Sequence, residues 1–326
     1  MQVLDEAITT GYRAFAKREA HGHSPTYEAW ALKIAESSEA HQFLLNLPPE
    51  KRQPNLLFAA IRAVTGTVPE ADDLPRLLQT QSADIRAVMA ARMTQTNEPN
   101  RCAVLLPQLL ALPQPLALLE VGASAGLCLL PDYYDYEIGG RKLAAPNPQA
   151  SGVPSVMLHC EAPEAYELPC AHLEVAWRAG LDLAPIDLRS VEEANWLRTL
   201  VWPEQTARLE RLNGAIEIAR QIKPPLHKGD LTKDLKGLME TAPPDATLVV
   251  FHSAVLNYVQ DAAQRQIFAE TMLASDAVWL SNESPRVYPF HEAHGLDAPA
   301  PGLFLLSKNG KPKAWTGPHG QSYTPV

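Results

Sequence analysis

The stretch ALLEVGASAGLCLL, residues 117–130, decides the fold of the chain's second half. It begins within the apolar run LALLEV, bounded by proline and glycine, which is typical of a strand buried on both faces. Gly122 and Gly126 then allow a tight turn, after which a helix is expected to begin. This order indicates either a loop that holds a nucleotide-like cofactor or an elbow that presents a nucleophilic serine.

The elbow interpretation rests on Gly122-Ala-Ser124-Ala-Gly126, which matches the G-x-S-x-G of α/β hydrolases. In that fold earlier strands supply the sheet and an oxyanion loop, whereas the chain upstream reads as helical. Glu120 also stands where an elbow strand is normally apolar. Triad partners would follow in the right order, Asp276 and then His291, His294 or His319. A serine hydrolase that uses Ser124 therefore stays as an alternative.

The cofactor interpretation is favoured by Glu120. A dinucleotide loop requires G-x-G-x-x-G, and its third glycine would fall on Leu127. A carboxylate at the strand end would repel a pyrophosphate but can balance the cation of S-adenosylmethionine. Rossmann-like methyltransferases carry an acid, an apolar residue and G-x-G-x-G here, with serine or alanine tolerated at the middle glycine. We expect Gly122, Ser124 and Gly126 to bind S-adenosylmethionine while Glu120 holds the loop; an ordinary turn without a ligand is the alternative.

Two acidic residues at later strand ends extend this set. A second strand is expected within HLEVAWRAGLDL, residues 172–183, and places Asp182 where it would accept hydrogen bonds from ribose hydroxyls. A short third strand in PLHKGDL, residues 225–231, is followed by Asp230, where methyltransferases bind the adenine amino group. The gap between Glu120 and Asp182 is 62 residues (182 − 120), which an insertion at about 131–170 would explain.

Catalytic candidates follow the fourth and fifth expected strands, ATLVVFHSAVL (246–256) and AVWLSNE (277–283). His252 could act as a general base near the methyl acceptor, because imidazole titrates near neutrality. Glu283 could bind a substrate amine or act as a base, and Tyr258 lies in the loop between the two strands. The alternatives are a hydrogen-bonded histidine in a packed loop and a salt-bridged or helix-capping carboxylate.

The strands and helices predict an α/β fold with a Rossmann-like, methyltransferase-type, mostly parallel sheet across residues 113–326. A hairpin that turns at Asn309-Gly310 predicts an antiparallel pair near its end. Residues 1–112 read as helices throughout and predict an N-terminal all-helical domain or cap. A long helix after residue 191 is expected to break at Pro203.

Two further motifs have competing interpretations. TNEPNR, residues 96–101, could fold over the cofactor, or form a polar turn in which Asn100 caps a helix. The pattern H-C…C-x-H suggests zinc, but its spacing is not that of a finger, so no metal is expected; its residues are His159, Cys160, Cys170 and His172.

Composition narrows the partners. Lys and Arg total 28 against 37 Asp and Glu, so the net charge is −9 and nucleic acid is a poor partner. No apolar run approaches the roughly 18 residues of a membrane span, so no membrane association is expected. Four cysteines without a C-x-x-C pair predict a reducing cytoplasm. A small-molecule substrate is the expected partner.

Five strings together resemble a bacterial family known as domain of unknown function 2332: TNEPNRCAVLLPQLLAL…LALLEVGASAGLCLLPDYYDY, RAGLDLAPIDL, WLRTLVWPEQTARLERL, FHSAVLNYV and WLSNESP. That family is similar in its core to S-adenosylmethionine-dependent methyltransferases. The resemblance supports the fold more than the reaction. From the residues themselves, binding of S-adenosylmethionine and methyl transfer to a small molecule are the expected function. A non-catalytic protein that binds S-adenosylmethionine or a nucleoside is the alternative from a different class.

Overall fold

The structure, a computed structural model, describes residues 5–147, 153–164, 166–169, 172–288 and 295–326. The chain folds into two units, the first made of residues up to Thr96 with Ser190–Glu210, and the second of Asn97–Arg189 with Arg211–Val326. This division differs from the expected boundary at residues 112–113. The segment that precedes the first strand belongs to the sheet-bearing unit, and a segment between the second and third strands returns to the helical one.

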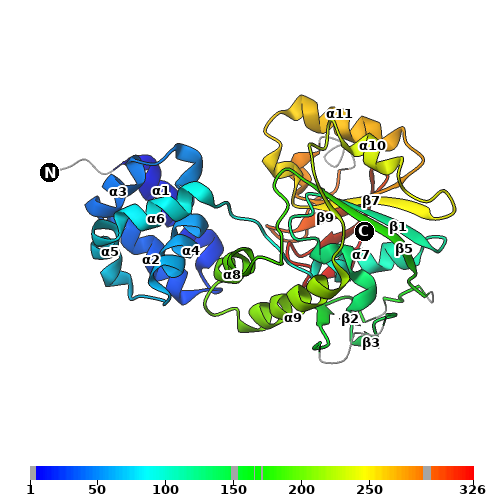
Figure 1. The fold of residues 1–326 in the computed structure, drawn as a ribbon, viewed down its shortest axis with the longest axis horizontal. Coiled ribbons are helices and arrows are strands. Elements are labelled where there is room, and N and C mark those ends of the chain that lie inside the picture. The colour runs from blue at the N-terminus through cyan, green and yellow to red at the C-terminus, as the bar shows by residue number, and fades with distance from the viewer. Residues whose placement is uncertain (1–4, 148–152, 165, 170–171, 289–294) are drawn as a thin grey trace. The chain divides into compact units, whose positions relative to one another are not determined.

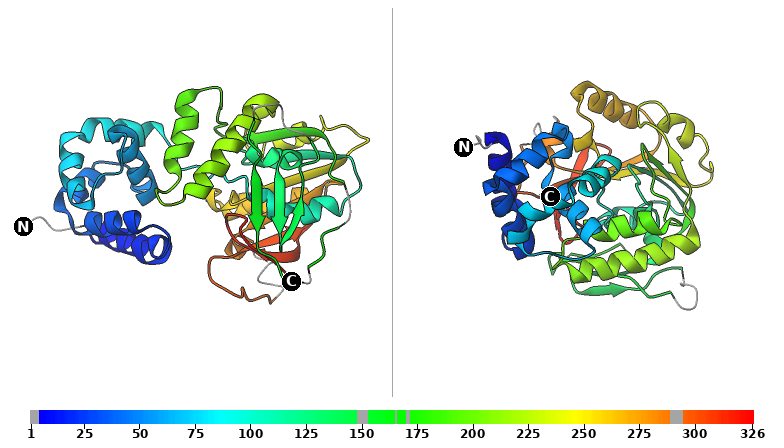
Figure 2. Two further views of the ribbon diagram at one scale, coloured as in Figure 1. Left: turned by 90° about the horizontal axis from the view of Figure 1, so that it is seen from below. Right: turned by 60° about the vertical axis from the view of Figure 1, so that its left-hand side comes forward.

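Every element of the first unit is a helix, and Figure 2 shows those of residues 5–96 gathered into one group (blue to cyan). Ser24 and Ser37 cap two of them by accepting hydrogen bonds from backbone N–H groups three residues on. The α-helices are α1 (Glu6–Phe15), α2 (Pro25–Glu36), α3 (Ser38–Leu45), α4 (Pro54–Thr65), α5 (Leu74–Thr80), α6 (Ser82–Ala91), α8 (Val191–Leu200) and the first turn of α9 (Thr206–Ile222). The shorter helices are a π-helix (Ala16–Ala20) and two 3₁₀ turns (Pro49–Lys51 and Ala71–Asp73).

Aromatic side chains form the centre of the first unit's core. Trp30 and Phe58 are buried edge to face with ring centroids 5.4 Å apart, and Tyr27 stacks on Trp30. Trp202, between α8 and α9, packs against Tyr27 and donates a hydrogen bond to Asn55. The break predicted at Pro203 is therefore confirmed, and the residues around it belong to this core.

The second unit is built on an eight-stranded, mostly parallel sheet in the order β11-β10-β9-β8-β7-β1-β5-β6. Pairing is parallel from β8 across to β6 and antiparallel from β8 to β11. The strands are β1 (Leu116–Val121), β5 (Val175–Asp182), β6 (Leu226–Lys228), β7 (Thr247–Ser253), β8 (Val278–Glu283), β9 (Phe304–Lys308), β10 (Lys311–Thr316) and β11 (Tyr323–Pro325).

Helices cover both faces of this sheet. Figure 1 shows α10 (Leu235–Met239) and α11 (Ala262–Leu273) along one face, and α7 (Arg101–Leu110) with α9 along the other. Leu119 and Val121 of β1 pack in the core beneath α10 and α11. Because side chains alternate along a strand, Glu120 between them points to the α7 face. Two 3₁₀ turns accompany the strands, Leu256–Tyr258 and Pro285–Val287.

A small three-stranded sheet, β3-β2-β4, occupies the segment predicted as an insertion. Its strands are β2 (Asp135–Ile138), β3 (Arg141–Leu143) and β4 (Met157–Cys160). The helix expected after the glycine turn is absent: only 3₁₀ turns form, at Leu127–Leu129 and Pro131–Tyr133. Pro131 explains the early end, because its ring disfavours helical continuation in the preceding residue.

The predicted hairpin is confirmed. Asn309 and Gly310 join β9 to β10 with φ of +48° and +72°, the left-handed pair that a two-residue hairpin turn requires. No helix in the described part of the chain is long and apolar enough to cross a membrane.

Candidate functional site

The glycine turn after β1 is fastened to the neighbouring strand β5. Gly122 donates its backbone N–H to the carbonyl of Leu181 at 2.8 Å. Ser124 donates its N–H to Asp182 Oδ2 at 2.7 Å, and Ala184 donates to Oδ1 at 2.8 Å. Two carboxylate oxygens therefore hold two backbone groups and fix the turn. Each oxygen has a second lone pair, so Asp182 keeps the capacity to accept from a ligand hydroxyl.

Ser124 is bonded to an amide side chain. Asn97 donates from Nδ2 to Ser124 Oγ at 3.0 Å and accepts from the N–H of Ala125 through Oδ1, also at 3.0 Å. Ser124 has φ of +50°, a conformation that costs a non-glycine residue energy. None of the described histidines forms a hydrogen bond with its hydroxyl, so none of them is placed as the general base of a hydrolase. His291 and His294 lie outside the described residues.

Glu120 is a buried acid without a hydrogen-bonding partner. Its side chain is 8% exposed, no described residue hydrogen-bonds to it, and Oε2 is fully enclosed. Burial raises its pKa well above the ordinary 4.5, and the nearby Cys128 and Asp182 act in the same direction, whereas the Arg101 guanidinium opposes them. A buried acceptor without a donor is rare in folded proteins and marks a candidate ligand site.

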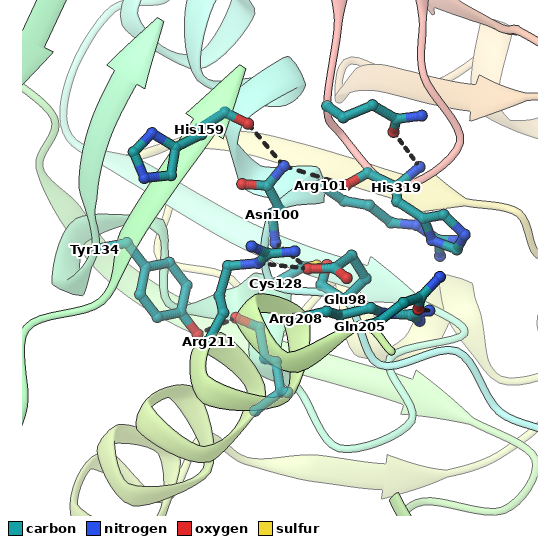
Figure 3. Close-up of polar contacts among 12 residues, drawn as sticks. Glu98, Asn100, Arg101, Cys128, Tyr134, His159, Gln205, Arg208, Arg211 and His319 are labelled. Carbon is teal, nitrogen blue, oxygen red and sulfur yellow. Dashed lines mark hydrogen bonds and ion pairs between the residues drawn. The ribbon is translucent and has the colours of Figure 1, made fainter. Parts of the chain in front are cut away.

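The segment TNEPNR anchors the site to four other parts of the second unit. Asn97 holds the glycine turn, and Glu98 accepts from Arg211 Nε at 3.0 Å (Figure 3). Asn100 is the N-cap residue of α7, but its side chain forms no cap and instead donates to the carbonyls of His159 and His319.

Arg101, the first residue of α7, was not identified as a site residue from the sequence. It is 7% exposed and donates to the carbonyls of Pro318 and Ser253 at 3.0 Å each, through Nε and Nη1. Among the described residues, none accepts from its Nη2. The guanidinium thus lies at the carboxyl edge of β7, close enough to Glu120 to lower its pKa. The one sequence signal was its place in a polar run directly before an apolar helix.

Val255 packs directly over the glycine turn. Gly122 has φ of +71°, and a Cβ atom there would lie 2.4 Å from Val255 Cγ2. Only glycine therefore fits between the loops that follow β1 and β7. These two strands flank the point where the sheet order reverses, which is where open α/β sheets bind ligands.

Asp230 lies at the same edge but engages its own turn. Its Oδ1 accepts from the N–H and the hydroxyl of Thr232, and these bonds lower its pKa. Gly229 donates to the carbonyl of Asp182 at 2.9 Å, so this loop is tied to the end of β5. The six predicted cofactor residues therefore share the carboxyl edge of β1, β5 and β6.

The three catalytic candidates lie elsewhere. His252 and Glu283 are fully buried on the α11 face, opposite the face of Glu120. Their Nδ1 and Oε1 are 2.7 Å apart, and Glu283 Oε1 also accepts from the N–H groups of Val255 and Leu256. Tyr258 is 64% exposed in the loop after β7. The pair is thus packed in the core and holds the loop.

Trp279 fixes the tautomer of His252. Its Nε1–H can only donate, and it lies 3.0 Å from His252 Nε2, which must therefore be the unprotonated acceptor. Nδ1 then carries the proton and donates it to Glu283. Both ring nitrogens are occupied, so His252 has no free position with which to take a proton from a substrate.

The described residues of the H-C…C-x-H pattern do not form a metal site. Cys170 lies outside the described residues, and His159 Nδ1 is 3.6 Å from a Glu137 oxygen. Within the described ranges, no group of three or more His, Cys, Asp or Glu side chains could hold a metal ion.

Of three comparisons with known proteins, only the comparison with family profiles gives a match. A search of curated proteins and a search of solved structures each return no match. One family profile matches residues 10–324, which is nearly the whole chain. The chain therefore belongs to the family described as uncharacterized protein conserved in bacteria (DUF2332).

Proposed function

We propose that the carboxyl edge of β1, β5 and β6 binds S-adenosylmethionine, and that the protein is a methyltransferase acting on a small molecule. The observation that carries the proposal is Glu120, a buried carboxyl group without a hydrogen bond at the end of the central strand. A sulfonium cation has no N–H or O–H to donate, so it needs a nearby negative charge and no hydrogen-bond partner. Glu120 offers that kind of contact.

The strand order supports a nucleoside ligand at this edge. When the five parallel strands are numbered by their order along the chain, their order across the sheet (β6-β5-β1-β7-β8) is 3-2-1-4-5, the order of Rossmann-like folds. The reversal lies between β1 and β7, beside the glycine turn. Asp182 ends the strand next to β1, where an acid in such folds meets ribose hydroxyls.

Leu183, next to Asp182, adds an apolar contact. It is 67% exposed and lies directly after the end of β5. An apolar side chain beside a carboxylate suits a nucleoside, which offers a flat base next to a sugar with two hydroxyl groups. Asp230, at the end of the next strand, is tied to the same edge through Gly229 and would face the base.

In this proposal the cofactor would supply an electrophilic methyl group, and the chain would bind and orient it. Glu120 would hold the sulfonium, Asp182 the ribose, and the turn from Gly122 to Gly126 the amino-acid end. Neither His252 nor Glu283 is placed to take a proton from an acceptor, which favours acceptors that need no base. It also favours the second candidate, a non-catalytic binder of the same ligand. Among the described residues, Cys102, Cys128 and Cys160 are free thiols, which fits a reducing cytoplasm.

Calorimetric titration tests the proposal by comparing S-adenosylmethionine with S-adenosylhomocysteine, which lacks the positive charge. We expect both to bind, the sulfonium about three- to tenfold more tightly. Glu120→Gln should abolish this preference while retaining the neutral ligand, and Asp182→Asn should weaken both. Glu240→Gln, an exposed acid after α10, is the matched control. Absence of binding at millimolar ligand, or an unchanged preference in Glu120→Gln, contradicts the proposal.

Proton release gives a second test of the same contact. Because burial raises the pKa of Glu120 and a bound cation would lower it, binding of the sulfonium should release a proton at a pH between these two pKa values. The measured heat should then depend on the ionisation enthalpy of the buffer for the sulfonium but not for S-adenosylhomocysteine. Formation of the demethylated product with a metabolite extract would distinguish an enzyme from a binder.

A further inference from the structure

A cavity of the sheet-bearing unit lies between the loop after β5 and the end of α9. Its volume is about 290 Å³, near the lower end of the range for small-molecule sites. Ala125 of the glycine turn contributes to its wall, but the cavity is lined by none of the six residues in the proposed cofactor set. It adjoins the glycine turn through Ala125, but its other lining residues belong to the loop after β5 and to the segment from the end of α9 to β6, so its ligand is tested separately from the proposed function.

The lining combines an apolar floor with a cationic rim. The floor is made of small and branched apolar side chains, among them Ile186, Leu188, Ala219 and Leu226. The rim carries Arg189, Arg220 and Lys223 against a single carboxylate, Asp187. In a chain whose net charge is −9, an excess of cations around one cavity is a local reversal of sign.

The three cations are not equally available. Arg189 is committed to Asp187 through bonds of 2.7–3.0 Å, which also lower the pKa of that acid to about 2. Arg220 donates from Nε to the Leu188 carbonyl at 2.8 Å and from Nη1 to Glu217 at 2.9 Å, and no described residue accepts from its Nη2.

Lys223 is the cation of the rim whose side chain is available to a ligand. It is exposed, and within the described ranges it has no hydrogen bond or ion pair through its side chain. Its φ of +53° puts it directly after α9 in the left-handed conformation that helix ends usually give to glycine or asparagine. A lysine at this position presents its charge at the cavity rim from a fixed backbone.

We propose that this cavity binds a small organic anion, with its apolar body against the floor and its carboxylate or phosphate between Lys223 and Arg220. The volume fits one ring or a short chain. An apolar ligand without a charge would leave Lys223 without a counter-charge, and a cationic ligand would meet charges of its own sign at the rim. The chemistry therefore selects for an anionic head on an apolar body.

Protein-observed NMR titration tests the inference with three probes that share a phenyl ring and differ in charge: benzoate, neutral benzamide and cationic benzylammonium. We expect benzoate to bind most tightly, with amide shifts at Ile186 and Leu188, and benzylammonium least. Lys223→Asn tolerates the backbone conformation and should weaken benzoate about three- to tenfold without affecting benzamide. Lys236→Gln, on exposed α10, removes the same charge away from the cavity and should change nothing.

Ala219→Leu provides an independent steric test, because its side chain would fill the floor of the cavity. It should weaken benzoate and benzamide together, while Lys223→Asn affects only the anion. Equal affinity for all three probes, or benzoate binding that neither variant changes, overturns the inference. So does the failure of benzoate, phenyl phosphate and hexanoate alike to bind at about 10 mM. Binding of S-adenosylmethionine is scored separately, so failure of either site is recognised on its own.

Discussion

The backbone N–H of Ser124 lies 2.7 Å from Asp182 Oδ2, although 58 residues separate the two. This bond joins the turn after β1 to the end of β5, and the second carboxylate oxygen secures Ala184 in the next loop. Asp182, which is expected to bind a ribose, therefore also fixes the loop that would hold the cofactor. Loss of Asp182 should therefore affect stability even without ligand.

Asp182→Ala should destabilise the ligand-free protein by about 2–3 kcal/mol, because it removes two charge-assisted hydrogen bonds from a half-buried site. Asp182→Asn keeps one acceptor oxygen and should cost about half as much. Urea denaturation followed by circular dichroism measures both. Asp187→Asn, a nearby exposed acid, should lie within about 0.5 kcal/mol of the parent protein. Equal stability of the Ala variant and the parent would show that the fastening is not needed.

Two substitutions of Ser124 distinguish the cost of its backbone strain from the contribution of its hydrogen bond to stability. Ser124→Ala loses the bond from Asn97 and keeps the unfavourable φ of +50°, so a loss of about 1 kcal/mol is expected. Ser124→Gly loses the same bond but relieves the backbone, and should be more stable than the Ala variant by about 0.5–1 kcal/mol. The reverse order would mean that the turn is not strained.

The parent protein should also fail to react with a fluorophosphonate. The Ser124 hydroxyl is bonded to an amide, and both nitrogens of His252 are occupied by Glu283 and Trp279. Mass spectrometry after incubation with the probe checks this. Stoichiometric labelling of Ser124 would support the serine hydrolase alternative and contradict the proposed function.

Gly122 and Val255 form a steric pair. Gly122→Ala should destabilise by about 2–4 kcal/mol, since its Cβ meets Val255 Cγ2 at 2.4 Å and φ is +71°. Adding Val255→Ala should remove the steric clash and so recover about 1–2 kcal/mol of the lost stability. The cost of the positive φ at residue 122 should remain. A double-mutant cycle measured by urea denaturation gives the coupling. Simple additivity of the two substitutions would show that the loops are not in contact at this point.

Much of this architecture follows from local sequence. The apolar runs predicted β1, β7 and β8, and the Asn309-Gly310 pair predicted the hairpin, because these signals depend on neighbouring residues only. The helix expected after Gly126 did not form, since proline at 131 follows too closely. Signals of this kind also placed Asp182 and Asp230 at strand ends.

The contacts that define the site depend on strand adjacency, which local sequence does not encode. His252 and Glu283 both lie at strand ends, yet which face they share follows from the pairing of β7 with β8. The burial of Glu120 against Arg101 depends on how α7 packs across the sheet. The sequence predicts His252 and Glu283 as catalytic candidates at strand ends, and the structure adds that both are buried and hydrogen-bonded to each other.

His252→Phe should be among the most destabilising substitutions in the unit. It would leave the Trp279 N–H and the Glu283 carboxylate buried without their partner, which costs about 3–5 kcal/mol. Combining it with Glu283→Gln removes the unpaired charge while an oxygen still accepts from the loop, so about 1–2 kcal/mol should return. Thermal and urea unfolding measure both variants. If the single variant were as stable as the parent, the pair would not hold the core.

The raised pKa of Glu120 predicts that the stability of the protein depends on pH. Folding raises that pKa well above 4.5, so the folded state binds the proton more tightly than the unfolded state. The resulting stabilisation is complete below the ordinary value and is lost as the pH rises through it toward the folded value, at no more than about 1.4 kcal/mol per pH unit. Glu120→Gln has no such proton, so its stability relative to the parent should increase from pH 4.5 upward. Urea denaturation between pH 4.5 and 8 measures the difference, with Glu240→Gln as a flat control. If the stability difference did not depend on pH, the carboxyl group of Glu120 would be in contact with water. The reason to expect a bound cation beside Glu120 would then disappear.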